Sequence, residues 1–153
     1  MDVLKTVRTV LGVRGFRAHL LDEATGAIET IANTWLDTMN APMRIRLGVD
    51  SRLNVALEVD GVAGDQGYLG ASSGERRRVD VALLLALADL AGSSTSREPG
   101  TLFLDEVFDT LDPNGVSGVC EVLDILGESR AAVVITHSDD LQGMVDATKH
   151  VAL

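Results

Sequence analysis

The fold is decided by the stretch Thr101-Leu-Phe-Leu-Asp-Glu106, a short apolar run that ends in two acids. The run predicts a strand buried in a sheet. In open α/β sheets, ligands bind at the carboxyl ends of the strands, where Asp105 and Glu106 would lie. Adjacent side chains point differently there, so one carboxylate could hold Mg²⁺ while the other orients an attacking water. The alternative is a strand that merely ends in two solvated acids.

The sequence after this stretch repeats the pattern. Ala131–Thr136 is a second apolar run, and His137 follows it directly. Between the two runs, Asp112 and Pro113 are typical of a helix start, with Asp112 as the N-cap. Strand, helix and strand in this order predict parallel strands covered by helices, which brings His137 to the edge that carries the two acids. The imidazole there could donate to a phosphate oxygen or could be structural.

The segment Ala71-Ser-Ser-Gly-Glu75 precedes this region and opens another predicted helix. Ser72 and Glu75 have the spacing of a capping box, and Val79–Ala91 is apolar almost all round, which predicts a buried helix. Small residues at a helix N-terminus leave backbone N–H groups that can face an anion, and the helix dipole favours negative charge there. The alternative is an ordinary N-cap.

The first third of the chain has two further patterns. Apolar residues recur at helical spacing over residues 15–41, which predicts a long amphipathic helix that ends before Pro42, with Trp35 in the core. Residues 1–14 could be the end of a coiled coil. Alternation with a period of two over residues 43–59 predicts a β-hairpin with one buried face, followed by a glycine-rich loop over residues 60–70.

Composition limits the remaining choices. The chain has 153 residues, of which 46% are hydrophobic, and a net charge of −10. This length suits one globular domain, and the charge argues against nonspecific nucleic-acid binding by the chain as a whole. The longest apolar run, Val81–Ala88, is far shorter than the roughly 20 residues that cross a bilayer. The single cysteine, Cys120, excludes an intramolecular disulfide and fits a reducing compartment.

Four of these segments, in this order, resemble the C-terminal lobe of ATP-binding-cassette (ABC) ATPases. The segment 71–75 looks like the signature motif, 101–106 looks like Walker B, Asp109-Thr-Leu-Asp112 looks like the D-loop, and His137 looks like the switch histidine. The match covers residues 70–153. The resemblance implies a single lobe over residues 1–153, with the P-loop NTPase-like α/β fold of that family.

The segments before the signature motif indicate the branch of the family. ABC transporters have a helical subdomain there, whereas a long helix and a β-hairpin resemble the SbcC and SMC classes of DNA-repair and chromosome ATPases. Gly15–Asp22 and Ala32–Leu36 are more like the SbcC class and are similar to phage recombination-endonuclease subunits. In that class the helix would leave the coiled coil and enter the second lobe.

The resemblance also implies a role for each candidate residue. On its own head, Asp105 would hold Mg²⁺, Glu106 would orient and activate water, and His137 would contact the γ-phosphate of ATP. Asp112 would belong to the ATP-binding residues and would communicate across a dimer of heads. Four signature residues would bind the ATP of the second head: Ser72, Ser73, Gly74 and Glu75.

The signature segment departs from the family pattern at two positions. Ser73 stands where the family usually has glycine, and Ala71 stands where it usually has leucine. We expect the serine to be tolerated, because it adds a hydroxyl donor as well as a Cβ. Three arginines, residues 76–78, follow at once and fan out around the helix, so that one of them could face the nucleotide or the D-loop, or all could be solvated.

The sequence contains no Gly-x-x-x-x-Gly-Lys-Ser/Thr, and no lysine occurs between Lys5 and Lys149. The loop that cradles the phosphates of ATP is therefore expected from an N-terminal Walker A lobe, in the same chain or a separate one, and the chain alone is expected to be inactive. The other implied partners are a second ATPase head, a nuclease subunit, and DNA through the assembled complex. The implied location is the cytoplasm, or the host cytoplasm or nucleoid if a phage encodes the chain.

Three functions stay open at this point. The first is the ATPase lobe of an SbcC-like machine that controls the processing of DNA double-strand breaks by a partner nuclease. The second is an SMC-like lobe that organises chromosomes. The third is a non-catalytic interaction module that keeps the fold. A transporter subunit is disfavoured by the hairpin before the signature motif.

Overall fold

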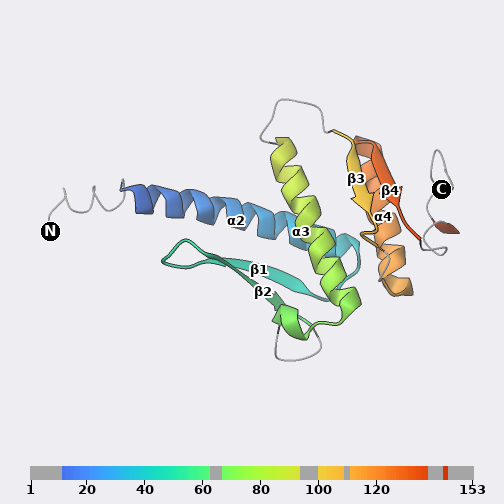
Figure 1. Cartoon of the computed structure of the whole chain (residues 1–153), viewed down its shortest axis with the longest axis horizontal. Helices are drawn as coiled ribbons and strands as arrows, with labels where there is room; N and C mark the ends of the chain where they lie inside the picture. The colour runs from blue at the N-terminus through green and yellow to red at the C-terminus, as the bar shows by residue number, and fades with distance from the viewer. Residues whose placement is uncertain (1–11, 63–66, 94–99, 109–110, 138–142, 145–153) are drawn as a thin grey trace.

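The computed structural model describes residues 12–62, 67–93, 100–108, 111–137 and 143–144. Its elements in chain order are α2 (Val13–Thr38), β1 (Arg44–Val49), β2 (Val55–Asp60), the 3-10 helix η1 (Gly67–Gly70), α3 (Ser73–Ser93), β3 (Leu102–Asp105), α4 (Pro113–Ser129) and β4 (Ala132–Ile135). The β1–β2 hairpin runs below α2, α3 crosses α2, and β3, β4 and α4 form a group at the far end (Figure 1). The predicted α/β class, with a long helix and a hairpin before a parallel strand pair, is confirmed.

The long helix ends earlier than predicted. The sequence placed its end at residue 41, before Pro42, but α2 ends at Thr38. Asn40 has a φ of +50°, and the Ala41 N–H donates to the Leu36 carbonyl at 2.9 Å while the Asn40 N–H donates to the Asp37 carbonyl. This is a Schellman motif with asparagine at the left-handed position, so the local C-cap ends the helix before proline can.

The hairpin has the predicted buried face but a longer turn. β1 and β2 pair antiparallel from Arg44 opposite Asp60 to Val49 opposite Val55, so the second strand begins at Val55 and not at residue 53. The carboxylate of Asp50 accepts from the backbone N–H groups of residues 52 and 54, and Leu53 has a φ of +65°. These bonds hold residues 50–54 as a turn, which removes Leu53 from the strand.

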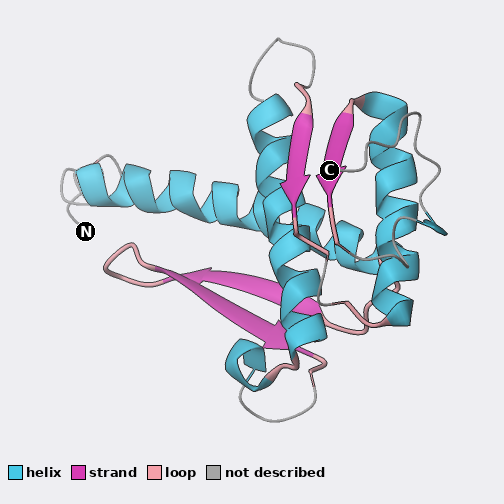
Figure 2. Cartoon of the chain, turned by 45° about the vertical axis from the view of Figure 1, so that its right-hand side comes forward, coloured by secondary structure: helices cyan, strands magenta, loops and turns pink. Residues whose placement is uncertain are grey.

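The strands β3 and β4 pair in parallel, with Asp105 opposite Ile135. They lie side by side, with α4 beside them (Figure 2). Leu104 is fully buried, whereas three apolar side chains of the opposite face are exposed: Phe103, Val133 and Ile135. The prediction that both strands are buried is therefore wrong for one face of the pair.

A single hydrophobic core joins the two groups of elements. It takes residues from α2, the hairpin, α3, β3 and α4, and its largest fully buried side chains include Leu36, Met39, Ile45, Leu85, Leu104, Phe108 and Leu126. α3 contributes one face to this core, while Leu84 and Leu87 are exposed, so the prediction of burial on all sides is also wrong. No helix in the described ranges has the length and apolar character needed to cross a membrane. The short helix predicted from Asp139 and the last strand predicted at residues 150–153 lie outside those ranges.

Candidate functional site

Two of the predicted catalytic residues meet at the carboxyl edge of the parallel pair. The Glu106 N–H donates to the Ile135 carbonyl at 2.8 Å, which continues the pairing one residue beyond β3. The His137 Nε2 atom lies 3.1 Å from the Glu106 Oε1 atom, and both side chains are largely exposed. Asp105 is exposed at the same edge. The arrangement places an acid and an imidazole within reach of a ligand that approaches the strand ends.

The backbone of Glu106 is unusual. Its φ of +49° lies in the left-handed region, which residues other than glycine, asparagine and aspartate rarely adopt. Such a conformation costs on the order of 1–3 kcal/mol and persists only where neighbouring structure enforces it. Here the hydrogen bond to Ile135 and the buried ring of Phe108 fix the chain on either side. Nothing in the sequence pattern indicated this strain, which is typical of functional positions.

The strand edge is suited to Mg²⁺ that binds together with a nucleotide. It is less suited to a metal ion whose ligands all come from the protein. Within the described ranges, no three His, Cys, Asp or Glu side chains come together as a metal cluster. Mg²⁺ in nucleotide sites usually takes one or two protein carboxylates, and water and phosphate oxygens supply its other ligands. The exposed carboxylate of Asp105 satisfies that requirement. Its role as the metal ligand stays a prediction.

The predicted signature turn is a capping box. Ser72 precedes the first residue of α3, its Oγ accepts from the Glu75 N–H at 3.3 Å, and the Glu75 carboxylate accepts from the Ser72 N–H at 2.8 Å. The backbone N–H groups of Ser73 and Gly74 lie in the first helical turn, where no intrahelical acceptor exists. The carboxylate of Glu75 therefore shapes the turn, while the N–H groups of Ser73 and Gly74 are the ones suited to an anion.

Asp112 is the N-cap of α4, as the sequence predicted. Its Oδ1 atom accepts from the Gly115 N–H at 3.0 Å and from the guanidinium of Arg78, which lies in α3. Burial alone would raise the pKa of Asp112, but the hydrogen bonds from Arg78 and Gly115 outweigh it and lower that pKa below its usual value. Among the three consecutive arginines, Arg78 reaches the D-loop-like segment through its ion pair with Asp112. Residues 109 and 110 of that segment lie outside the described ranges.

The lowered pKa of Asp112 predicts a loss of stability in acid. A carboxyl group whose pKa is lower in the folded state stabilises the fold above its unfolded pKa and loses that effect as pH falls through the folded pKa. The Asp112→Asn variant keeps a capping side chain without the charge, so its urea midpoint should fall less than that of the wild type between about pH 6 and about pH 3. Parallel falls in both proteins would contradict this origin of the acid sensitivity.

A second polar link was missed by sequence reasoning. The Trp35 indole N–H donates to Asp89 Oδ2 at 2.9 Å, and Asp89 Oδ1 accepts from the guanidinium of Arg130. Trp35 packs against the core, as predicted, but its indole also joins α2 to α3. The three residues lie far apart in the sequence, so no spacing pattern could have indicated the link.

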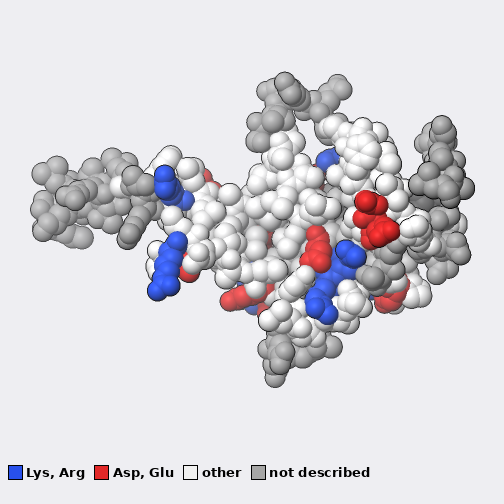
Figure 3. Space-filling model, viewed as in Figure 1, with Lys and Arg blue, Asp and Glu red and all other residues white. Residues whose placement is uncertain are grey.

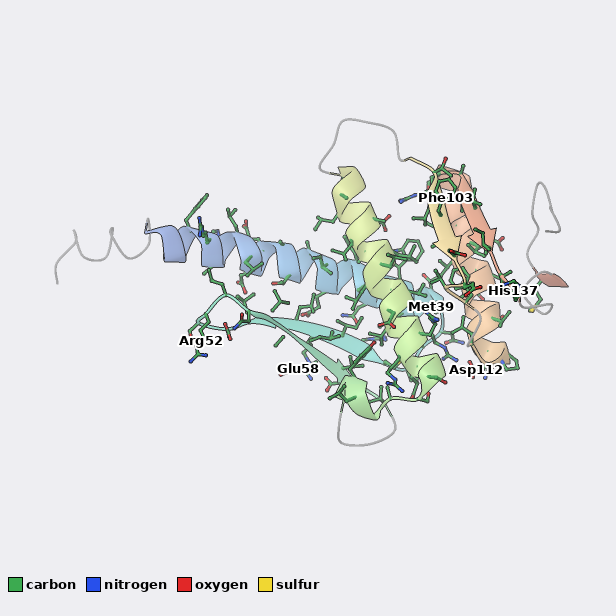
Figure 4. All side chains as sticks on the ribbon, in the orientation of Figure 1. Met39, Arg52, Glu58, Phe103, Asp112 and His137 are labelled. Atoms are coloured by element: carbon green, nitrogen blue, oxygen red, sulfur yellow. The ribbon has the colours of Figure 1, made fainter. Side chains whose placement is uncertain are left out.

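The two parts of the candidate site lie at one end of the molecule. His137 and Asp112 are close to the end formed by α4 and the strand edge, whereas Arg52 marks the opposite end of the hairpin (Figure 4). The ion pair between Arg78 and Asp112 shows that the first turns of α3 come to the same end. The fold thus gathers the sequence-predicted site residues toward one end. Glu106 contacts His137 there, and Ser72 contacts Glu75 in the capping box.

Three comparisons place the chain among known proteins. The family described as SbcC/RAD50-like, Walker B motif, matches residues 49–124. The C subunit of the nuclease SbcCD of Deinococcus radiodurans is 30% identical over 143 residues, which are 92% of this chain and 15% of that protein. Exonuclease subunit 2 of Enterobacteria phage T4 is 36% identical over 76 residues, which are 49% of this chain and 13% of that protein.

A solved structure has the same fold at low sequence identity. It comes from a study titled "Structural biochemistry of ATP-driven dimerization and DNA stimulated activation of SMC ATPases". The TM-score is 0.70 at 16% identity, and the alignment covers 89% of this chain and 83% of the other. By contrast, the chain spans only about one seventh of the length of the two curated relatives.

Proposed function

This chain belongs to the SbcC/SMC class of ABC-type ATPase heads, and from that premise we propose that it is the C-terminal lobe of an ATP-hydrolysing, SbcC-like head. A Walker A lobe, in the same or a separate chain, would supply the loop that cradles the phosphates. The completed head would dimerise on ATP and control how a partner nuclease processes DNA double-strand breaks. The names of the two curated relatives, which describe parts of a nuclease and of an exonuclease, support the nuclease partner.

The observation that carries the proposal is the edge formed by Asp105, Glu106 and His137. Mg²⁺ held by Asp105 would neutralise charge on the phosphates of ATP. Glu106 would accept a hydrogen bond from water and orient it, and its 3.1 Å contact with His137 holds the two side chains side by side at the strand ends. His137 would donate to a γ-phosphate oxygen. Catalysis at this edge is positioning with charge stabilisation.

The capping box supports a second contact, made with the nucleotide of another head. Its backbone N–H groups and the positive end of α3 face outward at the start of a 21-residue helix. The exposed hydroxyls of Ser72 and Ser73 add donors. A site that needs the signature turn of one head and the acid edge of another would be complete only in the dimer, which makes ATP the link between heads.

The exposed face of the β3–β4 pair supports the proposal that a Walker A lobe binds this chain. Parallel sheets are normally covered on both faces, yet Phe103 is 69% exposed and Val133 and Ile135 are exposed beside it. In the space-filling view the surface over the upper part of β3 is largely uncharged, with a basic side chain at its edge (Figure 3). Since this face includes the acid edge, a lobe that covers it would bring its phosphate-binding loop next to Asp105 and Glu106.

Replacing Phe103 with aspartate should prevent binding of the Walker A lobe while leaving the fold of this chain intact, because the ring is exposed. The measurement is co-purification of the two lobes, followed by ATP hydrolysis of the mixture. Leu69→Asp is the matched control, because Leu69 is 79% exposed but lies on η1, away from β3 and β4. Equal binding by the Phe103→Asp and Leu69→Asp variants would mean that this face is not the docking surface.

An SMC-like role in chromosome organisation is the second candidate, favoured by the fold of the SMC ATPase head described above. The sequence relatives favour the SbcC-like role instead. The assembled protein distinguishes the two: a nuclease that is purified with it in a fixed ratio supports the first proposal, and a different bridging protein in its place supports the second.

A further inference from the structure

We propose that Arg78 is a positioning residue, which holds the start of α4 in a fixed orientation relative to the helix that carries the signature turn. The orientation is a property of this chain alone, whereas its use in catalysis rests on the proposed function. None of the sequence motifs includes Arg78, since it lies beyond the capping box of α3 and far from Asp112 in the sequence.

A single carboxylate oxygen joins the two helices. The Oδ1 atom of Asp112 accepts from the Gly115 N–H, which caps α4, and from the Nη2 of Arg78, which belongs to α3. Arg78 is only 8% exposed, so its side chain lies across the interior side of this junction. Because both bonds end on one atom, a movement of α3 that carries Arg78 with it must displace the cap of α4.

Two glycines allow the approach that these bonds require. A Cβ on Gly115 would lie 2.8 Å from Asp112 Oδ1 and 3.1 Å from Arg78 Nε. A Cβ on Gly118, one turn later, would lie 2.5 Å from the carbonyl oxygen of Met39. The first two turns of α4 are thus seated against Arg78 and against the end of α2, with no space for a larger residue at either glycine.

A second ion pair joins the other ends of the same helices, and in this pair the acid belongs to α3 and the arginine to α4. Asp89, toward the end of α3, accepts from Arg130, which is the C-cap of α4. Arg78 and Asp112 join the starts of the helices, and Asp89 and Arg130 join their ends. Two ion pairs at separate points fix the angle between two helices as well as their distance. One ion pair would leave the angle free.

Stability accounts for Arg78 only in part. Its Nε atom is buried and has no hydrogen-bond partner within the described ranges, which opposes folding. A buried ion pair often contributes no more stability than apolar side chains that replace both partners, and removal of one partner costs most where the other is left buried. If Arg78 were methionine, Asp112 would remain half exposed and would still cap α4 through Gly115. The arginine is therefore better explained by the orientation that it enforces.

The consequence is a link between the two halves of the candidate site. The signature turn opens α3, and Arg78 follows it within two helical turns. The capped start of α4 follows Glu106 and the buried Phe108 by a short segment. Arg78 thus makes the element that would contact another head's ATP and the element that follows the acid edge move together.

The test measures the orientation directly in the full chain. Spin labels at Arg76→Cys in α3 and Ser117→Cys in α4, in a Cys120→Ala background, report the distance distribution between the exposed starts of the two helices. The unaltered junction should give a narrow distribution. Arg78→Met should broaden it in a chain that still folds and unfolds cooperatively in urea, and Arg78→Lys, which keeps the charge, should restore most of the narrowness. Arg46→Met, which removes the exposed ion pair with Asp60, should leave it narrow.

Each outcome decides for or against the inference. A narrow distribution in a stable Arg78→Met chain overturns it, as does equal broadening in the Arg46→Met control. If Arg78→Met does not fold, Asp112→Asn takes its place, because it keeps a cap and removes the charge that Arg78 needs. A narrow distribution in Asp112→Asn would then overturn the inference.

In the assembled head, Arg78→Met should lower kcat for ATP hydrolysis by about tenfold or more with an unchanged KM, because Arg78 positions other residues without touching ATP. Absence of hydrolysis by the unaltered assembly would refute the proposed function alone, since the distance distributions do not depend on ATP. An unchanged kcat in Arg78→Met, beside a broadened distribution, would limit the role of Arg78 to the shape of the lobe and overturn its part in catalysis.

Discussion

Replacing Glu106 with glutamine in the assembled head is expected to lower kcat for ATP hydrolysis by at least about 100-fold, while ATP binding and ATP-driven dimerisation persist. Glutamine has the shape of glutamate and can still accept a hydrogen bond from water, but it is a far weaker base and carries no charge. It also keeps the contact distance to His137, so the edge of the sheet should stay intact.

The measurement is a steady-state ATPase assay with a parallel assay of nucleotide-dependent dimerisation by light scattering. Glu58→Gln is the matched control, because Glu58 is an exposed acid on β2, away from the strand edge. Hydrolysis that survives in Glu106→Gln at the rate of this control would contradict the assignment of Glu106. It would favour the alternative in which the chain keeps the fold as a non-catalytic module.

Gly118→Ala is expected to destabilise the chain by about 1–3 kcal/mol, although alanine is the better helix former. The new methyl group would meet the backbone of Met39 at 2.5 Å from its carbonyl oxygen and 2.7 Å from its Cα. Neither atom can turn aside as the end of a flexible side chain could. Relief requires α4 to move away from the end of α2, which would also strain the Arg78–Asp112 tie.

Gly127→Ala is the control for that substitution, in the same helix. Gly127 is exposed, and a Cβ there has no neighbour within 4 Å, so alanine should stabilise the chain by about 0.5–1 kcal/mol. Urea unfolding of the two variants should therefore give shifts of opposite sign. Shifts of the same sign would mean that helix propensity, and not the approach of α4 to α2, governs position 118.

The sequence predicted the elements well where local chemistry decides them. The capping box of Ser72 and Glu75 and the N-cap at Asp112 depend on residues within one helical turn, and both are present. The strand ends at Asp105 and Ile135 were placed to within a residue or two, because an apolar run followed by polar residues fixes where burial ends. The edge that joins Glu106 and His137 then follows from parallel pairing.

Features that depend on neighbours distant in the sequence were not predictable. Glycine disfavours a helix, so residues 115 and 118 of the sequence suggested only a less stable helix. In the structure they are the positions where other residues approach α4 closely. The partners of Asp89 come from two elements that are remote along the chain. The exposed faces of α3 and of the strand pair were predicted as buried. An apolar pattern indicates that a face is covered, but it does not indicate whether this segment or another lobe covers it.

The strained conformation of Glu106 affects which substitutions at this position would stabilise the fold. Glycine or asparagine would adopt a φ of +49° with less strain, so losing the acid there would make the fold more stable. A copy of this lobe that had been released from the need to hydrolyse ATP would therefore drift away from glutamate at little penalty. Under the proposed function, glutamate at this position is kept for its chemistry at a cost in stability.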